Sequence, residues 1–151
     1  MNLMPSVPSP SPINARKRKL LDYVEKNLDE QDNSNRFNAA YREEDRRFTQ
    51  FLIPPGKRVL ELGCGSGALL ESLQPSYGLG IDFSAAAIAR ARELRPHLHF
   101  IQGDIEDAST LGSIDGQFDY IVVADTIGML EDIDGTLRLL HHLCEPSTRI
   151  V

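Results

Sequence analysis

The stretch VLELGCGSGALL, residues 59–70, constrains the fold more than any other part of the chain. Its first residues predict a short buried strand and its last residues predict the start of a helix, with three alternating glycines between them. A glycine-rich turn at such a junction exposes backbone amides and lets a ligand come close to the main chain, with the helix N-terminus behind it. The turn therefore predicts a site for a nucleotide-like ligand.

Strands and helices alternate through the rest of the chain. We expect strands over residues 58–63, 77–82, 98–102 and 118–124, helices over 67–74, 84–95 and 131–144, a loop up to residue 117, and a further strand opening at TRIV, residues 148–151. Strands that alternate with helices at this spacing build right-handed crossover units. The sequence thus predicts an α/β fold with a doubly wound, mostly parallel sheet that helices cover on both faces.

The region before the first strand differs in composition. Residues 1–14 are rich in serine and proline and predict a disordered tail. Apolar residues at helical spacing then predict helices over about 15–30 and 37–52, with Phe37, Tyr41, Phe48 and Leu52 near one face of the second. The basic run from Arg16 to Lys19 is interpreted as a solvated helix start. We therefore divide the chain into the tail, a helical segment at 15–56 and an α/β domain at 57–151.

Ligands of open parallel sheets bind outside the carboxyl ends of the strands, where the strand order reverses. Here the four predicted strands end at or near Gly63, Asp82, Asp104 and Asp125. Three carboxylates and the glycine turn should therefore meet at one rim of the sheet. The segment around Phe37–Tyr41 is expected to form a lid over this rim.

Charge and cysteine content limit the partners. The first 50 residues carry nine Lys/Arg and eight Asp/Glu, whereas residues 51–151 carry seven and fourteen. An acidic main body makes nucleic acid an unlikely partner. No apolar run approaches the roughly 20 residues of a membrane span, and the N-terminus lacks the apolar core of a secretory signal, so we expect a cytoplasmic protein. Cys64 and Cys144 predict reduced thiols and no metal site.

Two cofactors fit the glycine turn. The run from Gly63 to Ala68 matches a loose dinucleotide fingerprint, and the run from Glu61 matches the first motif of methyltransferases that use S-adenosylmethionine. Asp82 suits a ribose in either cofactor. Asp104 and the amide of Ile105 suit the edge of an adenine. A buried glutamate at position 61 needs a positive partner and would repel a pyrophosphate, so Glu61 favours S-adenosylmethionine over NAD.

Residues 36–151 resemble the class I S-adenosylmethionine-dependent methyltransferases. VLELGCGSG, GIDFS, GDIED and FDYIVVADTIGMLED stand in the order and at the spacing of that family. The resemblance implies S-adenosyl-L-methionine as cofactor. It implies that Glu61 and the turn, Gly63, Cys64, Gly65 and Gly67, hold the methionine end, with Asp82 on the ribose and Phe83 beside the adenine. Asp104 and Ile105 would read the adenine edge, and Ala124, Asp125 and Thr126 would line the floor beneath the methyl group.

The resemblance also implies that part of the family's sheet is absent from this chain. The family's sheet has seven strands, and this chain stops inside the fifth, so its C-terminal strands are expected to be absent. We accordingly expect the 151-residue chain to bind the cofactor without transferring methyl groups. The segments ADTIGMLEDI and LHHLCEPSTRIV resemble bacterial proteins in which such a domain is fused to a glycosyltransferase domain.

The methyl acceptor is not encoded in any recognisable motif. The Asn/Asp-Pro-Pro-aromatic motif of nucleic-acid amino methyltransferases is absent after the fourth strand, which favours a small-molecule acceptor. Methyl transfer requires mainly alignment and exclusion of water, and the nearby candidates for a base, Asp125, Glu131, His141 and His142, leave the catalytic residue unassigned. An NAD(P)-dependent oxidoreductase and a non-catalytic cofactor-binding module remain the alternatives.

Overall fold

The computed structural model describes residues 14–26 and 36–151, and in the second range it describes side chains from residue 40 onward. The predicted disordered tail up to residue 13, the end of the first predicted helix and the side chain of Phe37 lie outside the described residues. None of the described helices is long and apolar enough to cross a membrane.

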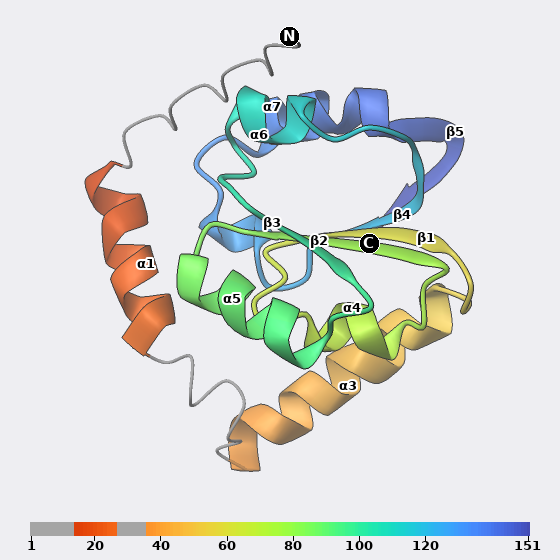
Figure 1. Cartoon of the computed structure of the whole chain (residues 1–151), viewed down its shortest axis with the longest axis horizontal. Helices are drawn as coiled ribbons and strands as arrows, with labels where there is room; N and C mark the ends of the chain where they lie inside the picture. Colours follow the sequence, from red (N-terminus) through yellow and green to blue (C-terminus); the bar gives the residue numbers. More distant parts are fainter. Residues whose placement is uncertain (1–13, 27–35) are drawn as a thin grey trace, which may run out of the picture.

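A five-stranded parallel sheet forms the centre of the molecule (Figure 1). Its spatial order is β3-β2-β1-β4-β5. The order moves outward from β1 through β2 to β3 and then returns to the other side of β1, so the reversal lies between β1 and β4. Their register pairs Glu61 with Val122. The strands are β1 (Arg58–Leu62), β2 (Tyr77–Asp82), β3 (His99–Gln102), β4 (Phe118–Val122) and β5 (Cys144–Ile150).

Helices cover both faces of this sheet, as Figure 1 shows. One face carries α3 (Arg36–Leu52), α4 (Ala68–Ser72) and α5 (Ala85–Leu94), and the other carries α6 (Ala108–Gly112), α7 (Ile133–Leu139) and the 3₁₀ helix η2 (Leu140–Leu143). Each face has its own apolar core, one around Leu70 and Ile88 and the other around Leu111 and Leu140. The predicted doubly wound α/β fold is therefore confirmed.

Two segments differ from the prediction. The expected loop up to residue 117 contains α6, which Asp107 caps by accepting a hydrogen bond from the amide of Ser109. The expected helix over 131–144 starts after its cap, Asp132, and tightens into η2, so that Cys144 opens the strand β5 rather than ending a helix. Short polar elements of this kind lack the periodicity that reveals longer ones.

The predicted apolar face of α3 is wrong at Tyr41 and Phe48, which are 56% and 62% exposed. The buried positions are Thr49 and the following Ile53. Thr49 tolerates burial because its hydroxyl donates to the carbonyl of Asp45, one turn earlier. The helix is therefore rotated by about one residue from the orientation that its aromatic residues suggest. By contrast, α1 (Ala15–Lys26) buries no residue completely.

Candidate functional site

A cavity of about 540 Å³ opens where the carboxyl ends of β1 to β4 meet. Its volume lies within the range of typical small-molecule sites, and its position at the reversal of strand order is the one expected for a parallel sheet. The predicted site residues that line it are Glu61, Gly63, Cys64, Gly65, Asp82, Phe83, Asp104, Ile105, Ala124, Asp125 and Thr126. Gly67 is not among the lining residues.

Two glycines of the turn are required for packing. Gly63 and Gly67 both have positive φ values, 75° and 79°, which favour glycine. A Cβ on Gly63 would collide with the hydroxyl of Thr126, so the segment after β4 lies directly against the turn. A Cβ on Gly67 would come within 2.7 Å of the Phe100 ring, so this glycine serves the core and not the cavity.

The turn is fastened to β2 by its own amides. The amides of Gly63 and Cys64 donate to the carbonyl of Ile81, at 2.8 and 3.0 Å. The amide of Gly65 donates to Asp82 Oδ2 at 2.9 Å. These three amides are therefore committed within the protein, and a pyrophosphate at this turn would have to compete for them. The Cys64 side chain packs into the core, where burial raises the pKa of its thiol.

Asp82 lies at the centre of the site. Besides Gly65, its carboxylate accepts a hydrogen bond from the amide of Ser84 at 2.9 Å. Burial raises its pKa above the usual range, although these two amides oppose the shift. A carboxylate accepts about four hydrogen bonds, so acceptor capacity remains for a pair of ligand hydroxyls. The N-cap of α5 is Ser84, whose hydroxyl accepts a hydrogen bond from the amide of Ala87. The Asp82 side chain is therefore not needed as the cap of this helix.

Glu61 is the second buried carboxyl group, only 4% exposed at the floor of the cavity. Its Oε2 accepts a hydrogen bond of 3.2 Å from the amide of Leu70, in α4. Burial raises its pKa to about 8, because this bond and the charge of Arg95 compensate only in part, while Asp82 adds repulsion. At neutral pH the group is therefore largely protonated, and a cation placed in the cavity would favour its ionised form.

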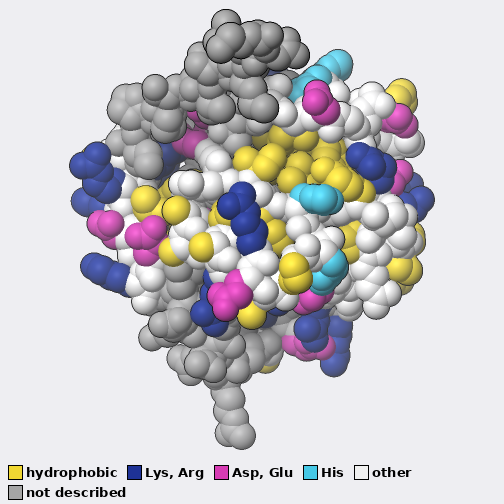
Figure 2. Space-filling model, viewed as in Figure 1, with side chains coloured by type: hydrophobic (Ala, Val, Ile, Leu, Met, Phe, Trp, Pro, Cys, Tyr) yellow, Lys and Arg dark blue, Asp and Glu magenta, His cyan; other side chains and the backbone are white. Residues whose placement is uncertain are grey.

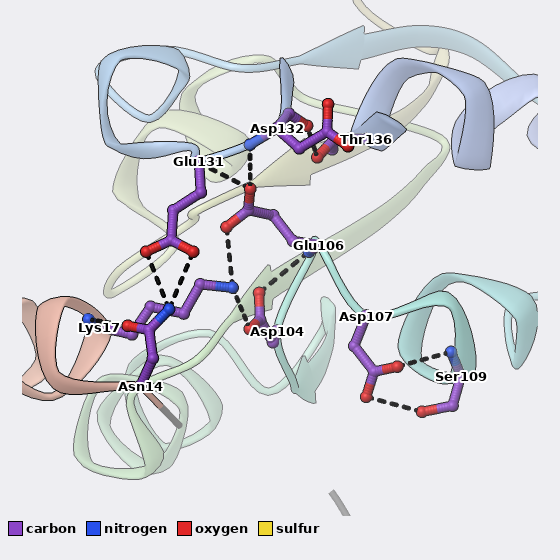
Figure 3. Close-up of polar contacts among 9 residues, drawn as sticks. All are labelled: Asn14, Lys17, Asp104, Glu106, Asp107, Ser109, Glu131, Asp132 and Thr136. Carbon is purple, nitrogen blue, oxygen red and sulfur yellow. Dashed lines mark hydrogen bonds and ion pairs between the residues drawn. The ribbon is translucent and has the colours of Figure 1, made fainter. Parts of the chain in front are cut away.

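Asp104 also lines the cavity, and it contacts α1 (Figure 3). The Lys17 ammonium lies 2.5 Å from Asp104 Oδ2 and 2.8 Å from Glu106 Oε2. Burial disfavours the charge of Lys17, but the hydrogen bonds to the two carboxylates outweigh it and raise its pKa. Figure 3 also shows Asn14 donating to both carboxylate oxygens of Glu131. We call these contacts of Asn14 and Lys17 the α1 clasp.

Glu106 links the clasp to the start of α7. Its Oε1 accepts hydrogen bonds from the amides of Glu131 and Asp132, at 2.7 and 2.8 Å. The pKa of Glu106 is lowered because Lys17 and these amides outweigh the effect of burial. The cavity lining also includes Ile105, which is buried in the core, and Phe83, which is partly exposed.

From the N-terminal helices, sequence reasoning placed only the segment around Phe37–Tyr41 near this site, as a lid, and it missed the residues that line the cavity. The cavity is also lined by Lys17, Leu20 and Val24 of α1 and by Arg42, Glu43, Asp45 and Arg46 of α3. Lys17 belongs to the basic run that was interpreted as solvated, yet its side chain is only 19% exposed. Its partners are 87 and 89 residues away in the sequence, and no local pattern signals such a contact.

Of the four candidate bases named from the sequence, all within the described residues, Asp125 lines the cavity and the other three do not. His141 and His142 are exposed in η2, and Glu131 belongs to the α1 clasp. Asp125 follows β4 with a φ of 56°, and its Oδ1 accepts a hydrogen bond of 3.2 Å from the Tyr41 hydroxyl. Within residues 14–26 and 36–151, no three His, Cys, Asp or Glu side chains gather as they would around a metal ion.

Comparison with known proteins places this architecture among methyltransferases. The chain is 28% identical over 99 residues to the ubiquinone biosynthesis O-methyltransferase of Pseudomonas aeruginosa, covering 63% of this chain and 43% of that protein. The YcgJ protein of Bacillus subtilis has the same fold, with a TM-score of 0.62, 18% identity and coverage of 72% of this chain and 49% of the other.

A third relative has a known ligand. An S-adenosylmethionine-dependent methyltransferase of Geobacter sulfurreducens, solved in complex with S-adenosyl-L-homocysteine, matches with a TM-score of 0.53 and 26% identity, covering 68% of this chain and 43% of that one. The chain thus spans less than half the length of each of these three proteins. The family model described as a methyltransferase domain matches residues 14–151, which include the glycine turn and all the lining residues. The chain therefore belongs to the methyltransferase-domain family.

Proposed function

We propose that the cavity binds S-adenosyl-L-methionine and that the protein transfers the methyl group to a small-molecule acceptor. The observation that carries this proposal is the pair of buried carboxyl groups, Asp82 and Glu61, beside a glycine turn whose amides at Gly63, Cys64 and Gly65 are already committed. Such a site suits a ligand with ribose hydroxyls and a positive charge, and it suits a pyrophosphate poorly. The cofactor meets both requirements and supplies a methyl group on a sulfonium.

Each part of the ligand has a candidate partner in the cavity. Asp82 would accept hydrogen bonds from the ribose, and Glu61 with the glycine turn would hold the charged methionine end. Phe83, Asp104 and the amide of Ile105 would contact the adenine. Ala124, Asp125 and Thr126 would form the floor beneath the methyl group, because Thr126 packs against Gly63. Held in this way, the methyl carbon and an acceptor need only be aligned and kept dry, effects worth roughly 7–11 kcal/mol.

A small molecule is the acceptor that the surface favours. The chain carries a net charge of −6. On the face seen in Figure 2, side chains of both signs are interspersed and form no basic stripe of the kind that follows a nucleic-acid backbone. The Pseudomonas relative is named for ubiquinone biosynthesis, a small-molecule pathway. We further propose a cytoplasmic location, which suits the two free thiols, and retain the fused glycosyltransferase domain as a prediction.

Calorimetric titration with S-adenosylhomocysteine and, separately, with NADH tests the cofactor. We expect saturable binding of S-adenosylhomocysteine and none of NADH; the reverse would favour the oxidoreductase alternative. Incubation of the full-length protein with labelled S-adenosylmethionine and a panel of phenols, quinols and amines then tests transfer. Binding without transfer to any of them, under conditions where a known methyltransferase reacts, would favour a non-catalytic module.

A further inference from the structure

The helix α1 presents two faces of different character. On its inner face, Lys17 is held by the α1 clasp, and Leu20 and Val24 line the cavity. Figure 1 shows the helix at the periphery of the molecule, outside the sheet and the helices that cover it. The opposite side of α1 is therefore turned away from the body of the protein.

This outward side carries a row of cations with one tyrosine. Four residues recur at spacings of three, four and three positions, which places them along one side of the helix. They are Arg16, Lys19, Tyr23 and Lys26, and we call them the outer face of α1. All four are exposed, Tyr23 by 64%. The acidic residues of this helix, Asp22 and Glu25, stand outside the row.

The charge of the chain is divided unevenly between α1 and the rest. Of the 16 Lys/Arg and 22 Asp/Glu in the chain, α1 carries five and two, which leaves eleven and twenty for the remainder. A negatively charged surface therefore attracts α1 and repels the body of the protein. Such a distribution orients the protein in front of that surface with α1 foremost.

Bilayers and nucleic acids both present large negative surfaces, and the composition of α1 favours a bilayer. The outer face runs from Arg16 to Lys26, about 15 Å along the helix, and it contains three cations, whereas a nucleic-acid backbone is usually followed by a longer basic track. Tyrosine is enriched at the level of lipid headgroups, because its ring is apolar and its hydroxyl is polar. A basic amphipathic helix at the surface is typical of membrane contact.

We propose that the outer face of α1 docks the protein on an anionic bilayer, with its three cations on lipid phosphates and Tyr23 among the headgroups. The α1 clasp stays closed in this arrangement, because Lys17 lies on the other side of the helix and keeps its carboxylate partners. Since the inner face lines the cavity, docking brings the cavity close to the headgroups. The docking requires no ligand in the cavity and is independent of the proposed function.

Vesicle flotation with the purified chain tests the docking. We expect vesicles made of equal parts phosphatidylcholine and phosphatidylglycerol to carry the protein at low salt, and vesicles of phosphatidylcholine alone to leave it behind. The double variant Arg16→Gln, Lys19→Gln removes two cations of the outer face and leaves Lys17 in place. It should bind the anionic vesicles roughly twentyfold more weakly, because each cation near such a surface contributes about fivefold.

Two further variants serve as controls. The double variant Arg138→Gln, Arg149→Gln removes the same charge from exposed positions in α7 and β5, and it should bind as the wild type does. Phe51→Ser tests a rival surface on α3, where Phe51 is 84% exposed and is the most exposed large hydrophobic residue in the described part of the chain. This variant should also bind as the wild type does.

The outcomes decide between α1, α3 and net charge. A protein that floats with neither kind of vesicle overturns the proposal, and so does one whose α1 variant shifts the mobility of a short RNA duplex but not its flotation. Equal weakening in both double variants would show that net charge governs binding. Weaker binding by Phe51→Ser with an unaffected α1 variant would move the docking surface to α3. Weakening confined to the α1 variant supports the outer face of α1.

Discussion

Glu61 links the stability of the folded chain to pH. Its pKa is raised from 4.5 to about 8 in the folded state, so the folded state holds a proton that the unfolded state has lost between these values. The contribution to stability is complete below about pH 4.5 and disappears as pH rises through 8, with a slope of at most about 1.4 kcal/mol per pH unit. We expect Glu61→Gln to gain stability relative to the wild type between pH 5 and pH 9 in urea unfolding. Curves that stay parallel would show that Glu61 is already ionised.

The same group should couple cofactor binding to proton release. If Glu61 receives the charged methionine end, binding at pH 7 stabilises its carboxylate and expels the proton that burial retains. Calorimetry of S-adenosylhomocysteine in buffers of different ionisation enthalpy should show up to one proton released by the wild type. The Glu61→Gln variant, which has no titratable group at this position, should release fewer protons. Equal release from both proteins would place the methionine end elsewhere.

We expect Asp82 to contribute to cofactor affinity directly, and not only through its hydrogen bonds to the backbone. Asp82→Asn removes charge-assisted hydrogen bonds to the ribose, worth roughly 1.5–3 kcal/mol, and we expect S-adenosylhomocysteine to bind about tenfold or more weakly. Because Asp82 also supports Gly65 and Ser84, the control is Ser84→Ala, which loses the cap of α5 but no ligand contact. If both variants weaken binding equally in titrations of folded protein, the role of Asp82 is structural.

Among the elements, α1 depends on its polar contacts with the body of the protein. It buries no residue, and its ion pairs run from Lys17 to Asp104 and Glu106, beside the proposed adenine position (Figure 3). We expect Lys17→Met to speed amide exchange over residues 15–26 and to raise the dissociation rate of S-adenosylhomocysteine roughly fivefold, the effect of an ion pair worth about 1 kcal/mol. Lys19→Met, on an exposed position of the same helix, is the control. Unchanged exchange in Lys17→Met would show that α1 is held by other contacts.

The elements also show which parts of the structure a sequence encodes locally. Strands β1 to β4 and helix α5 were predicted because their signals are local: apolar runs, glycines and the Ser84 cap each lie within a few residues of the element they mark. The positions of Asp82 and Asp125 at the rim then follow from parallel topology alone. The contact of Lys17 with Asp104 could not be predicted, since it joins side chains 87 residues apart that are ordinary in their own surroundings. The segment around Tyr41 was expected near the rim, but its hydrogen bond to Asp125, 84 residues away, was not.

At the scale of the whole molecule, β5 forms one edge of the five-stranded sheet. Its first half is poorly suited to pairing with another chain, because it contains Pro146 and a register shift and because the amide of Glu145 donates to the hydroxyl of Thr148. Its last residues pair regularly with β4, and the Ile150 side chain there is 48% exposed. A regular edge with an exposed isoleucine invites pairing between copies of the 151-residue chain, although the charged Arg149 also lies there.

We therefore expect the 151-residue chain to self-associate with rising concentration in sedimentation velocity, and Ile150→Lys to shift it toward the monomer. A lysine on an edge strand opposes such pairing because its charge would be buried or brought beside its own copy. The control is Ile133→Lys, which places the same charge on a similarly exposed isoleucine, 43% exposed, at the start of helix α7 and not on the edge strand. If Ile133→Lys dissociates the assembly as effectively as Ile150→Lys, association depends on general surface apolarity and not on β5. If the wild type stays monomeric at all concentrations, the exposed edge does not cause association, and the irregular first half of β5 is enough to prevent edge pairing.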